Sequence, residues 1–210
     1  MRFPAPKKLI LGFSRVALAL TLVCSLAPAR ADVTADYDQG MTSFRNGDLL
    51  SAMAPLRRAA EAGHAPAQTT LAYILDLGEY NEEAVRYYQM AADQKYPPGI
   101  HGLASMVLSG DGVEQDATRA YALFLEAASL GYDPSWAALA DALLNKHMAP
   151  PTTPPTAETI LTKAADTGYL RAADALAKNY ATGGLDLPKD AAKAAQWTQR
   201  AIELRGATQK

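Results

Sequence analysis

The three histidines are the first residues to consider for chemistry, because an imidazole can act near neutral pH as a general base or a metal ligand. His64, His101 and His147 are far apart in the sequence. None of them lies at metal-ligand spacing from a Cys, Asp or Glu, and the one cysteine, Cys24, lies near the N-terminus. We therefore expect no metal site and no thiol chemistry in this chain.

Other catalytic patterns are also absent from the sequence. The loop Gly110-Asp111-Gly112 lacks the Lys and Ser/Thr of a phosphate-binding loop and the spaced carboxylates of a calcium loop. Neither a Gly-x-Ser-x-Gly nor a His-Glu-x-x-His motif occurs, and the pair Glu82-Glu83 is typical of a solvated helix face. We predict no enzymatic activity and no cofactor.

The first 31 residues have the pattern of a secretory signal peptide. Basic residues precede a short apolar run at 16–27, and Ala29-Arg30-Ala31 places small residues before a cleavage site between Ala31 and Asp32. The run is short for a membrane span, which needs about 20 residues. We expect a periplasmic or secreted protein with no stable membrane insertion after cleavage; an uncleaved anchor is the alternative. Leu22 and Val23 before Cys24 argue against lipidation.

Loss of this leader changes the charge of the chain. Five of the 20 basic residues and none of the 22 acidic ones fall in the leader, so residues 32–210 carry 15 basic and 22 acidic residues, a net charge of −7. Nucleic acids and anionic lipids need clustered Lys and Arg. We therefore expect no nucleic-acid partner.

A short phrase of the form Ala-Ala-x-x-Gly returns five times along the chain, with its last copy degraded. Its second residue falls at positions 60, 92, 128, 165 and 202, which gives steps of 32, 36, 37 and 37 residues. A period in this range is typical of stacked structural units. His64 occupies the position after the phrase that tyrosines fill in the next three copies, and we interpret it as a residue that packs between units. Such repeats favour binding over catalysis.

Each unit is expected to contain two helices. In the first helix, apolar or small residues recur four, five and eight positions after the first one, as Gly99, Leu103, Ala104 and Val107 do, which lines one helical face. Glycine at 63, 131 and 168 would close the second helix in a left-handed conformation, and Asp116 would cap a helix start. No stretch alternates with period two. We predict an all-α solenoid of about five helix-turn-helix repeats over residues 32–210, with repeats at about 36–64, 65–96, 97–132, 133–169 and 170–206.

The run from Leu103 to Tyr132 resembles a Sel-one-like repeat, a relative of the tetratricopeptide repeat. The fifth unit shares further positions with the pattern of this family: Tyr180, Gly183, Asp190, Lys193, Ala194, Trp197 and Ala201. Val107 stands where the family has Tyr, and Leu123 and Ile160 stand where it has Trp. Pro55 falls inside the second helix of the first unit, where it should kink that helix or shift its start. The resemblance implies an adaptor of the bacterial envelope that binds a protein or peptide.

The predicted binding surface is a groove formed by the first helices of the repeats. One step after the first apolar position, the aligned repeats place Gln68, Ile100, Trp136 and Ala173; six steps after it, they place Tyr73, Ser105, Asp141 and Lys178. Trp136 and Tyr73 are large aromatic residues of the kind enriched at binding hot spots. The alternative for Trp136 is that it packs between repeats.

Three other functions remain open at this level. A peptidoglycan- or glycan-binding module would be favoured by exposed aromatic residues in the groove. An accessory regulator of an envelope hydrolase is the second, and a hydrolase in its own right would need a catalytic constellation that the sequence does not contain. The loop Pro151-Thr152-Thr153-Pro154 fits a PxxP pattern, which we interpret as a stiff connection between helices. The sequence predicts neither the identity of the partner nor the oligomeric state.

Overall fold

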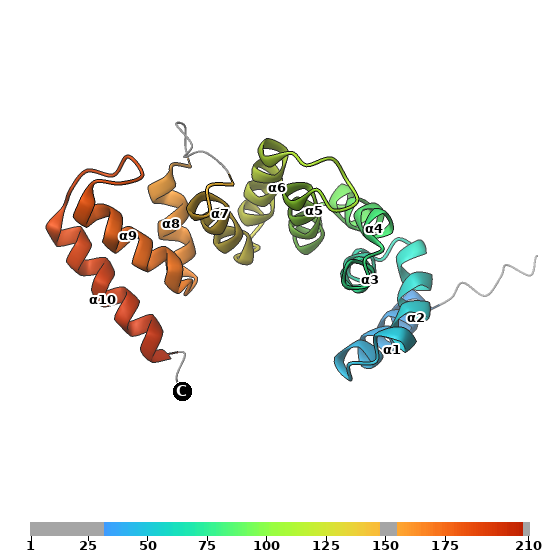
Figure 1. Ribbon diagram of the computed structural model, residues 1–210. Coiled ribbons are helices and arrows are strands. Elements are labelled where there is room, and N and C mark those ends of the chain that lie inside the picture. Colours follow the sequence, from blue (N-terminus) through green and yellow to red (C-terminus); the bar gives the residue numbers. More distant parts are fainter. Residues whose placement is uncertain (1–31, 148–154, 208–210) are drawn as a thin grey trace, which may run out of the picture. The chain divides into compact units, whose positions relative to one another are not determined.

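The computed structural model describes residues 32–147 and 155–207, and within them the protein contains α-helices and no strand. The helices follow one another in pairs along the chain (Figure 1). The predicted all-α solenoid of helix pairs is confirmed. The pairs are α1 (Val33–Arg45) with α2 (Leu49–Glu61), α3 (Ala65–Leu77) with α4 (Asn81–Asp93), α5 (Pro97–Ser109) with α6 (Ala117–Ser129), α7 (Pro134–Leu144) with α8 (Ala157–Asp166), and α9 (Leu170–Thr182) with α10 (Ala191–Ala207).

Several helices, among them α2, α3 and α6, begin where a side chain accepts a hydrogen bond from a free backbone N–H group of the first turn. Asp48 accepts a hydrogen bond from the backbone N–H of Ser51 at 3.0 Å, and Asp116 accepts one from Arg119 at 2.9 Å, which confirms the predicted cap. His64 caps α3 through Nδ1, which accepts from the N–H of Ala67, while its ring lies 4.5 Å from that of Tyr37. His64 therefore packs between helices, as predicted.

The second helices of the first four pairs are each followed by a residue in the left-handed conformation. Gly63, Gly131 and Gly168 have φ values of 92°, 88° and 96°, which confirms the predicted helix ends. In the second pair the same position is occupied by Lys95, with φ of 57°. The repeat therefore imposes this backbone conformation even where the sequence does not supply a glycine.

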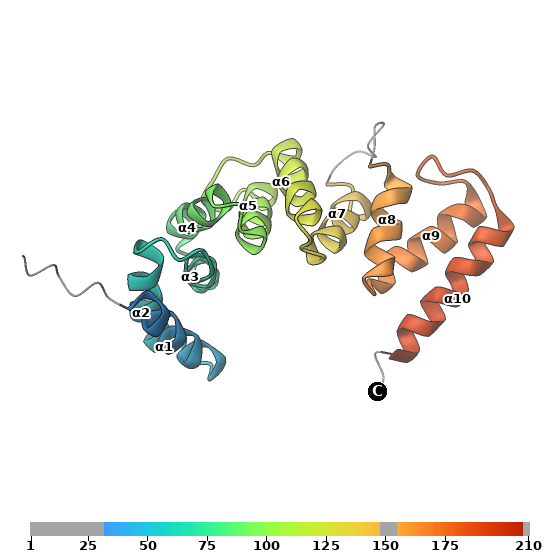
Figure 2. The ribbon, with the colours of Figure 1, turned by 180° about the vertical axis from the view of Figure 1, so that it is seen from behind.

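The core runs along the chain between successive helices. The predicted apolar stripe is buried in α3, α5 and α7, and in α9 three of its four residues are buried while Ala177 is half-buried. Each helix packs on the next, and first helices also contact one another, α3 with α5 and α7 with α9 (Figures 1 and 2). Small residues allow this approach: a Cβ added to Gly102 of α5 would lie 2.2 Å from the ring of Tyr88 in α4.

Pro55 lies in the middle of α2, which begins six residues earlier and continues to Glu61. The proline does not shift the start of the helix, and whether it kinks the helix stays a prediction. The predicted leader (1–31) and the PxxP loop lie outside the described residues. None of the described helices has the length and apolar composition needed to cross a membrane.

Candidate functional site

The two predicted columns of the groove differ in where the structure places them. Gln68 and Ile100 are each 1% exposed, and Ala173 is fully buried. Gln68 donates a hydrogen bond from its amide to the carbonyl of Ala60 in α2 and accepts one from Gln94 at 2.7 Å. The prediction that Gln68 and Ile100 line the groove is therefore wrong: both side chains belong to the interior.

The geometry of the helix explains this error. Each residue of an α-helix is rotated by about 100° around the helix axis from the one before. The residue one step after the first apolar residue therefore lies, around this axis, between the residues eight and five steps after it, which is inside the apolar stripe. Trp136 shares this column; it is half-buried and packs against the core, as the alternative reading proposed. The position six steps on lies outside the stripe, and its residues reach the surface.

The residues of the outer column are accessible. Tyr73 is 45% exposed, Ser105 and Lys178 are exposed, and Asp141 is partly buried. Lys178 borders a small hollow of about 330 Å³ beside Arg171 and Asp174, apart from the other three. Tyr73, Ser105 and Asp141 line two larger cavities, and Ser105 belongs to both of them. The structure thus brings together three of the seven predicted groove residues.

The first of these cavities, which we call the aromatic cavity, has a volume of about 460 Å³ and lies beside Tyr73. Its walls come from α1, α3, α4, α5 and the turn after α6, and its rings are those of Phe44, Tyr73, Tyr88, His101 and Tyr132. The ring of Phe44 meets that of Tyr73 edge-on at 6.1 Å. Asp76, in the last turn of α3, supplies a carboxylate to the same wall.

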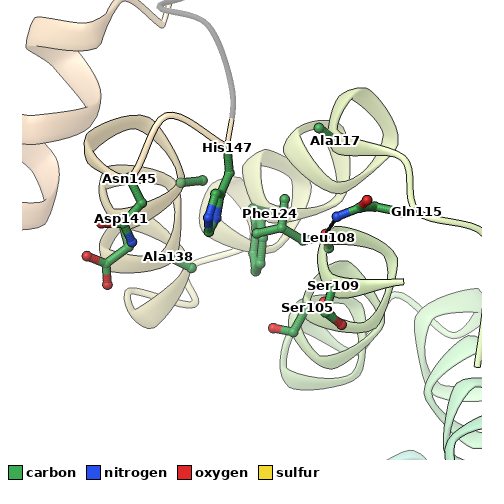
Figure 3. Close-up of a pocket in the computed structure, with 11 residues that line it drawn as sticks. Ser105, Leu108, Ser109, Gln115, Ala117, Phe124, Ala138, Asp141, Asn145 and His147 are labelled. Carbon is green, nitrogen blue, oxygen red and sulfur yellow. Dashed lines mark hydrogen bonds between the residues drawn. The ribbon is translucent and has the colours of Figure 1, made fainter. Parts of the chain in front are cut away.

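The second cavity, which we call the α5–α7 cavity, has a volume of about 630 Å³ (Figure 3). Phe124 of α6 lies at its centre, with Ser105 and Ser109 of α5 on one side and Asp141 of α7 on the other. The ring of His147 points into the space from the segment after α7. An apolar centre with a polar rim is typical of pockets that bind a side chain or a small ligand.

The two cavities lie next to each other, and the ring of His101 in one contacts the ring of Phe124 in the other. His101, which lines the aromatic cavity, has its ring 5.2 Å from that of Phe124, which lines the α5–α7 cavity. Nδ1 of His101 is 3.0 Å from the hydroxyl oxygen of Ser135, and burial lowers the pKa of His101. Ser135 is fully buried, so this pair offers no accessible nucleophile. The pair holds α5 against α7 at the wall between the cavities.

Asp141 has a structural role besides lining a cavity. Its Oδ2 accepts a hydrogen bond of 2.6 Å from the hydroxyl of Tyr169, and its Oδ1 pairs with Arg171. Arg171 also donates to Oδ1 of Asn145 at 3.1 Å. Burial and the bond to Asp141 raise the pKa of Tyr169. Both carboxylate oxygens of Asp141 are thus engaged within the chain, and they hold the fourth helix pair to the fifth.

Most of the cavity residues were not identified from the sequence. Phe44, Asp76, Tyr88 and Tyr132 come from four different segments, and only the folded chain brings them together. His147 was considered only as a catalytic base or a metal ligand, and among the described residues no group of three or more His, Cys, Asp and Glu is placed to hold a metal ion. An aligned reading of positions three steps after Tyr73 in each repeat would have found Asp76.

Comparison with known proteins gives the family. The Sel1 repeat pattern matches residues 65–96, 97–132 and 170–205. Among solved structures, the chain is similar to c5321, described as a protective antigen present in uropathogenic Escherichia coli strains displaying an SLR fold, with 24% identity and a TM-score of 0.70. That match covers 81% of this chain and 38% of the antigen, so the chain spans well under half of the antigen's length.

A second similar structure is a Sel1 repeat protein from Oxalobacter formigenes, with 23% identity, a TM-score of 0.65, and coverage of 81% of this chain and 73% of that one. At these identities the similarity to both structures shows the fold alone. No curated protein matches the chain. The three matched repeats, together with the helix pairs and the left-handed helix ends, show that the chain is a scaffold protein of the Sel1 repeat family.

Proposed function

We propose that this protein binds a segment of a partner protein across α3, α5 and α7 in the bacterial envelope. The observation that carries the proposal is the position of Ser105, an exposed residue shared by the aromatic cavity and the α5–α7 cavity. A segment that crosses α5 at Ser105 would place one side chain in each cavity. Burial of a few side chains in such pockets supplies most of the affinity of many interfaces.

The test is a substitution that blocks both cavities without removing a core residue. In Ser105→Trp the exposed serine becomes a side chain large enough to fill the shared entrance. Ser51→Trp, at an exposed serine of α2 that lines neither cavity, is the matched control. Partners are identified by crosslinking and mass spectrometry from intact cells that express each full chain. The expected result is loss of the partner with Ser105→Trp and retention with Ser51→Trp.

Tyr73→Ala provides a second measurement on the same surface. Because Tyr73 is exposed, its removal should lower partner recovery while the circular dichroism spectrum and unfolding temperature stay near those of the wild type. If Ser105→Trp and Tyr73→Ala both leave the crosslinked partners unchanged in folded protein, the proposed surface is wrong.

The proposed location in the envelope needs a measurement of its own. The expected mature protein begins at Asp32, whose side chain caps α1 by accepting hydrogen bonds from the backbone N–H groups of Thr34 and Ala35. The intact mass of the protein recovered from the periplasm of a Gram-negative host should therefore correspond to residues 32–210. A mass that includes residues 1–31 would contradict cleavage at this site.

A glycan strand is the second candidate ligand, and the exposed ring of Tyr73 favours it, because aromatic faces stack on apolar surfaces. Purified sacculi separate the two candidates. If the protein pellets with sacculi and Tyr73→Ala abolishes pelleting, the surface binds peptidoglycan; if the wild type stays in the supernatant, the protein partner is retained as the proposal.

A further inference from the structure

Asp76 is a carboxylate in the wall of the aromatic cavity that no other group of the described chain neutralises. Its side-chain carboxylate forms no hydrogen bond and no ion pair among the described residues, although several other carboxylates, such as those of Asp36 and Glu126, pair with an Arg or Lys. Half-buried carboxylates normally find such a partner, because burial of an unpaired charge is unfavourable. A positive group beside Asp76 would therefore be favourable, and the described residues supply none.

The electrostatics of the cavity reinforce this conclusion. Burial raises the pKa of Asp76, and the nearby negative charge of Asp111 raises it further. Among the described residues no Lys or Arg lines the cavity, and the described base that does line it, His101, has its pKa lowered by burial, which favours its neutral form. The cavity thus carries negative charge without compensation, and a cation would relieve it.

The remaining walls suit a cation on an apolar stem. The rings of Tyr73, Tyr132 and Phe44 line the space around Asp76, and aromatic faces attract ammonium and guanidinium groups. The hydroxyl oxygen of Thr69, also in the wall, is buried and has no hydrogen-bond partner among the described residues. A volume of about 460 Å³ lies within the range of side-chain and small-ligand pockets.

We propose that the aromatic cavity binds the side chain of a Lys or Arg residue of the partner segment, with its cationic head at Asp76 and its stem against the tyrosine rings. The inference rests on the proposed function, since the segment that crosses α3 and α5 would carry this residue. It adds a sequence requirement to the partner: a basic residue next to the residue that enters the α5–α7 cavity.

Titration with single amino-acid amides tests the site directly. The probes are Nα-acetyl-lysine methylamide and Nα-acetyl-arginine methylamide, with the norleucine amide as an uncharged analogue that keeps the four-carbon stem of lysine and lacks its ammonium group. Two-dimensional amide NMR spectra of the wild-type chain should show saturable shifts at Tyr73, Asp76 and Ser105 with the two basic probes and not with norleucine. Asp76→Asn should weaken the basic probes about tenfold or more.

Asp166→Asn is the matched control, because it removes the same charge from an exposed position of α8 far along the chain from the cavity. It should leave the affinity unchanged. Equal binding of norleucine, an unchanged affinity in Asp76→Asn, or an equal loss in Asp166→Asn would each overturn the inference. Tighter saturable binding of phosphocholine than of the lysine probe would overturn it in favour of a lipid headgroup.

The test of the cation site can fail independently of the test of the proposed partner-binding surface. If Ser105→Trp abolishes partner crosslinks and Asp76→Asn binds the basic probes as well as the wild type does, the scaffold surface stands and the cation site is wrong. If the probes bind at Asp76 while the crosslinks do not respond to Ser105→Trp, the cation site stands and the proposed surface is wrong.

Discussion

Lys95 occupies the place that glycine takes at three other helix ends, with φ of 57°. A left-handed conformation costs a residue with a Cβ about 1–2 kcal/mol, whereas glycine adopts it freely. The substitution Lys95→Gly also loses the pair between Lys95 and Glu126, but that lysine is 69% exposed, so solvent screening leaves the pair little effect on stability. We expect Lys95→Gly to be as stable as the wild type or more stable, by up to about 1 kcal/mol.

The control for this prediction is Lys95→Ala, which loses the same ion pair and keeps the Cβ. Chemical denaturation should show Lys95→Gly to be more stable than Lys95→Ala by about 1 kcal/mol. Equal stability of the two variants would show that the backbone at this helix end is not strained.

The residue scale also shows what the sequence could predict. Gly63, Gly131 and Gly168 were assigned from their place after the Ala-Ala phrase, because a left-handed helix end has a clear residue preference. Gln68 was misplaced because its column, one step after the first apolar position, was assigned to the groove although it falls inside the apolar stripe. Its amide satisfies the carbonyl of Ala60, and this partner eight residues earlier in the chain is known only from the folded structure.

At the scale of elements, the close contact of α5 with α4 depends on Gly99. A Cβ at this position would lie 2.4 Å from the Cβ of Ala91 and 3.3 Å from its carbonyl carbon, so the backbones would have to separate. Overpacking of this kind costs about 1–3 kcal/mol, which exceeds the gain of about 1 kcal/mol from alanine in a helix. We expect Gly99→Ala to lower the free energy of unfolding by up to about 2 kcal/mol, the overpacking cost less the gain from alanine.

Gly206 of α10 is the matched control, since nothing lies within 4 Å of a Cβ added there. Gly206→Ala should be neutral or slightly stabilising in the same denaturation experiment. A destabilisation of equal size in both variants would contradict the packing argument.

A second contact between elements joins three helices through one carboxylate. Glu158 of α8 accepts a hydrogen bond from the hydroxyl of Tyr180 in α9 and pairs with Lys193 of α10 at 3.2 Å. The hydrogen bond from Tyr180, with a smaller contribution from Lys193, lowers the pKa of Glu158. A lowered pKa in the folded state means that the carboxylate stabilises the fold above its ordinary pKa of about 4.3 and loses this effect as the pH falls.

The pH dependence of Glu158→Gln follows from this sign. The variant should be less stable than the wild type at pH 7, and the difference should shrink as the pH falls below about 4. Glu114→Gln, at an exposed glutamate with no ion pair among the described residues, is the matched control and should be about as stable as the wild type at pH 7. A difference between Glu158→Gln and the wild type that stays constant with pH would show that the charge of Glu158 is not involved.

Element by element, the helices were predictable and their polar contacts were not. The 3.6-residue period of positions such as Leu103 and Val107 reports local burial, which is why it predicts each helix and its inner face. Glu158, Tyr180 and Lys193 lie far apart in the sequence, so no local pattern connects them. The aromatic cavity was missed for the same reason, since Phe44 and Tyr132 reach it from different repeats.

At the scale of the whole molecule, stability is shared between neighbours along the chain. Each helix packs mainly on the one before and the one after, and a Sel1-type solenoid is stabilised mainly by the units themselves and by the interfaces between adjacent ones. The interior helices α3 and α5 each bury six or more residues, whereas α10 buries only Ala201 among its described residues. The last helix therefore has much less packing to lose when it opens.

This difference predicts the order of local opening, which hydrogen exchange measures. Amides in the middle of α10 should exchange with a lower free energy of opening than amides of α3 and α5, because α10 can detach from α9 without exposing the central core. α1, which buries only Gly40, should open in the same way at the other end. The surface around Ser105 lies on the well-packed helices and should stay protected at the backbone, as a preformed binding site requires. Uniform opening energies along all helices would instead show that the chain unfolds as one cooperative unit.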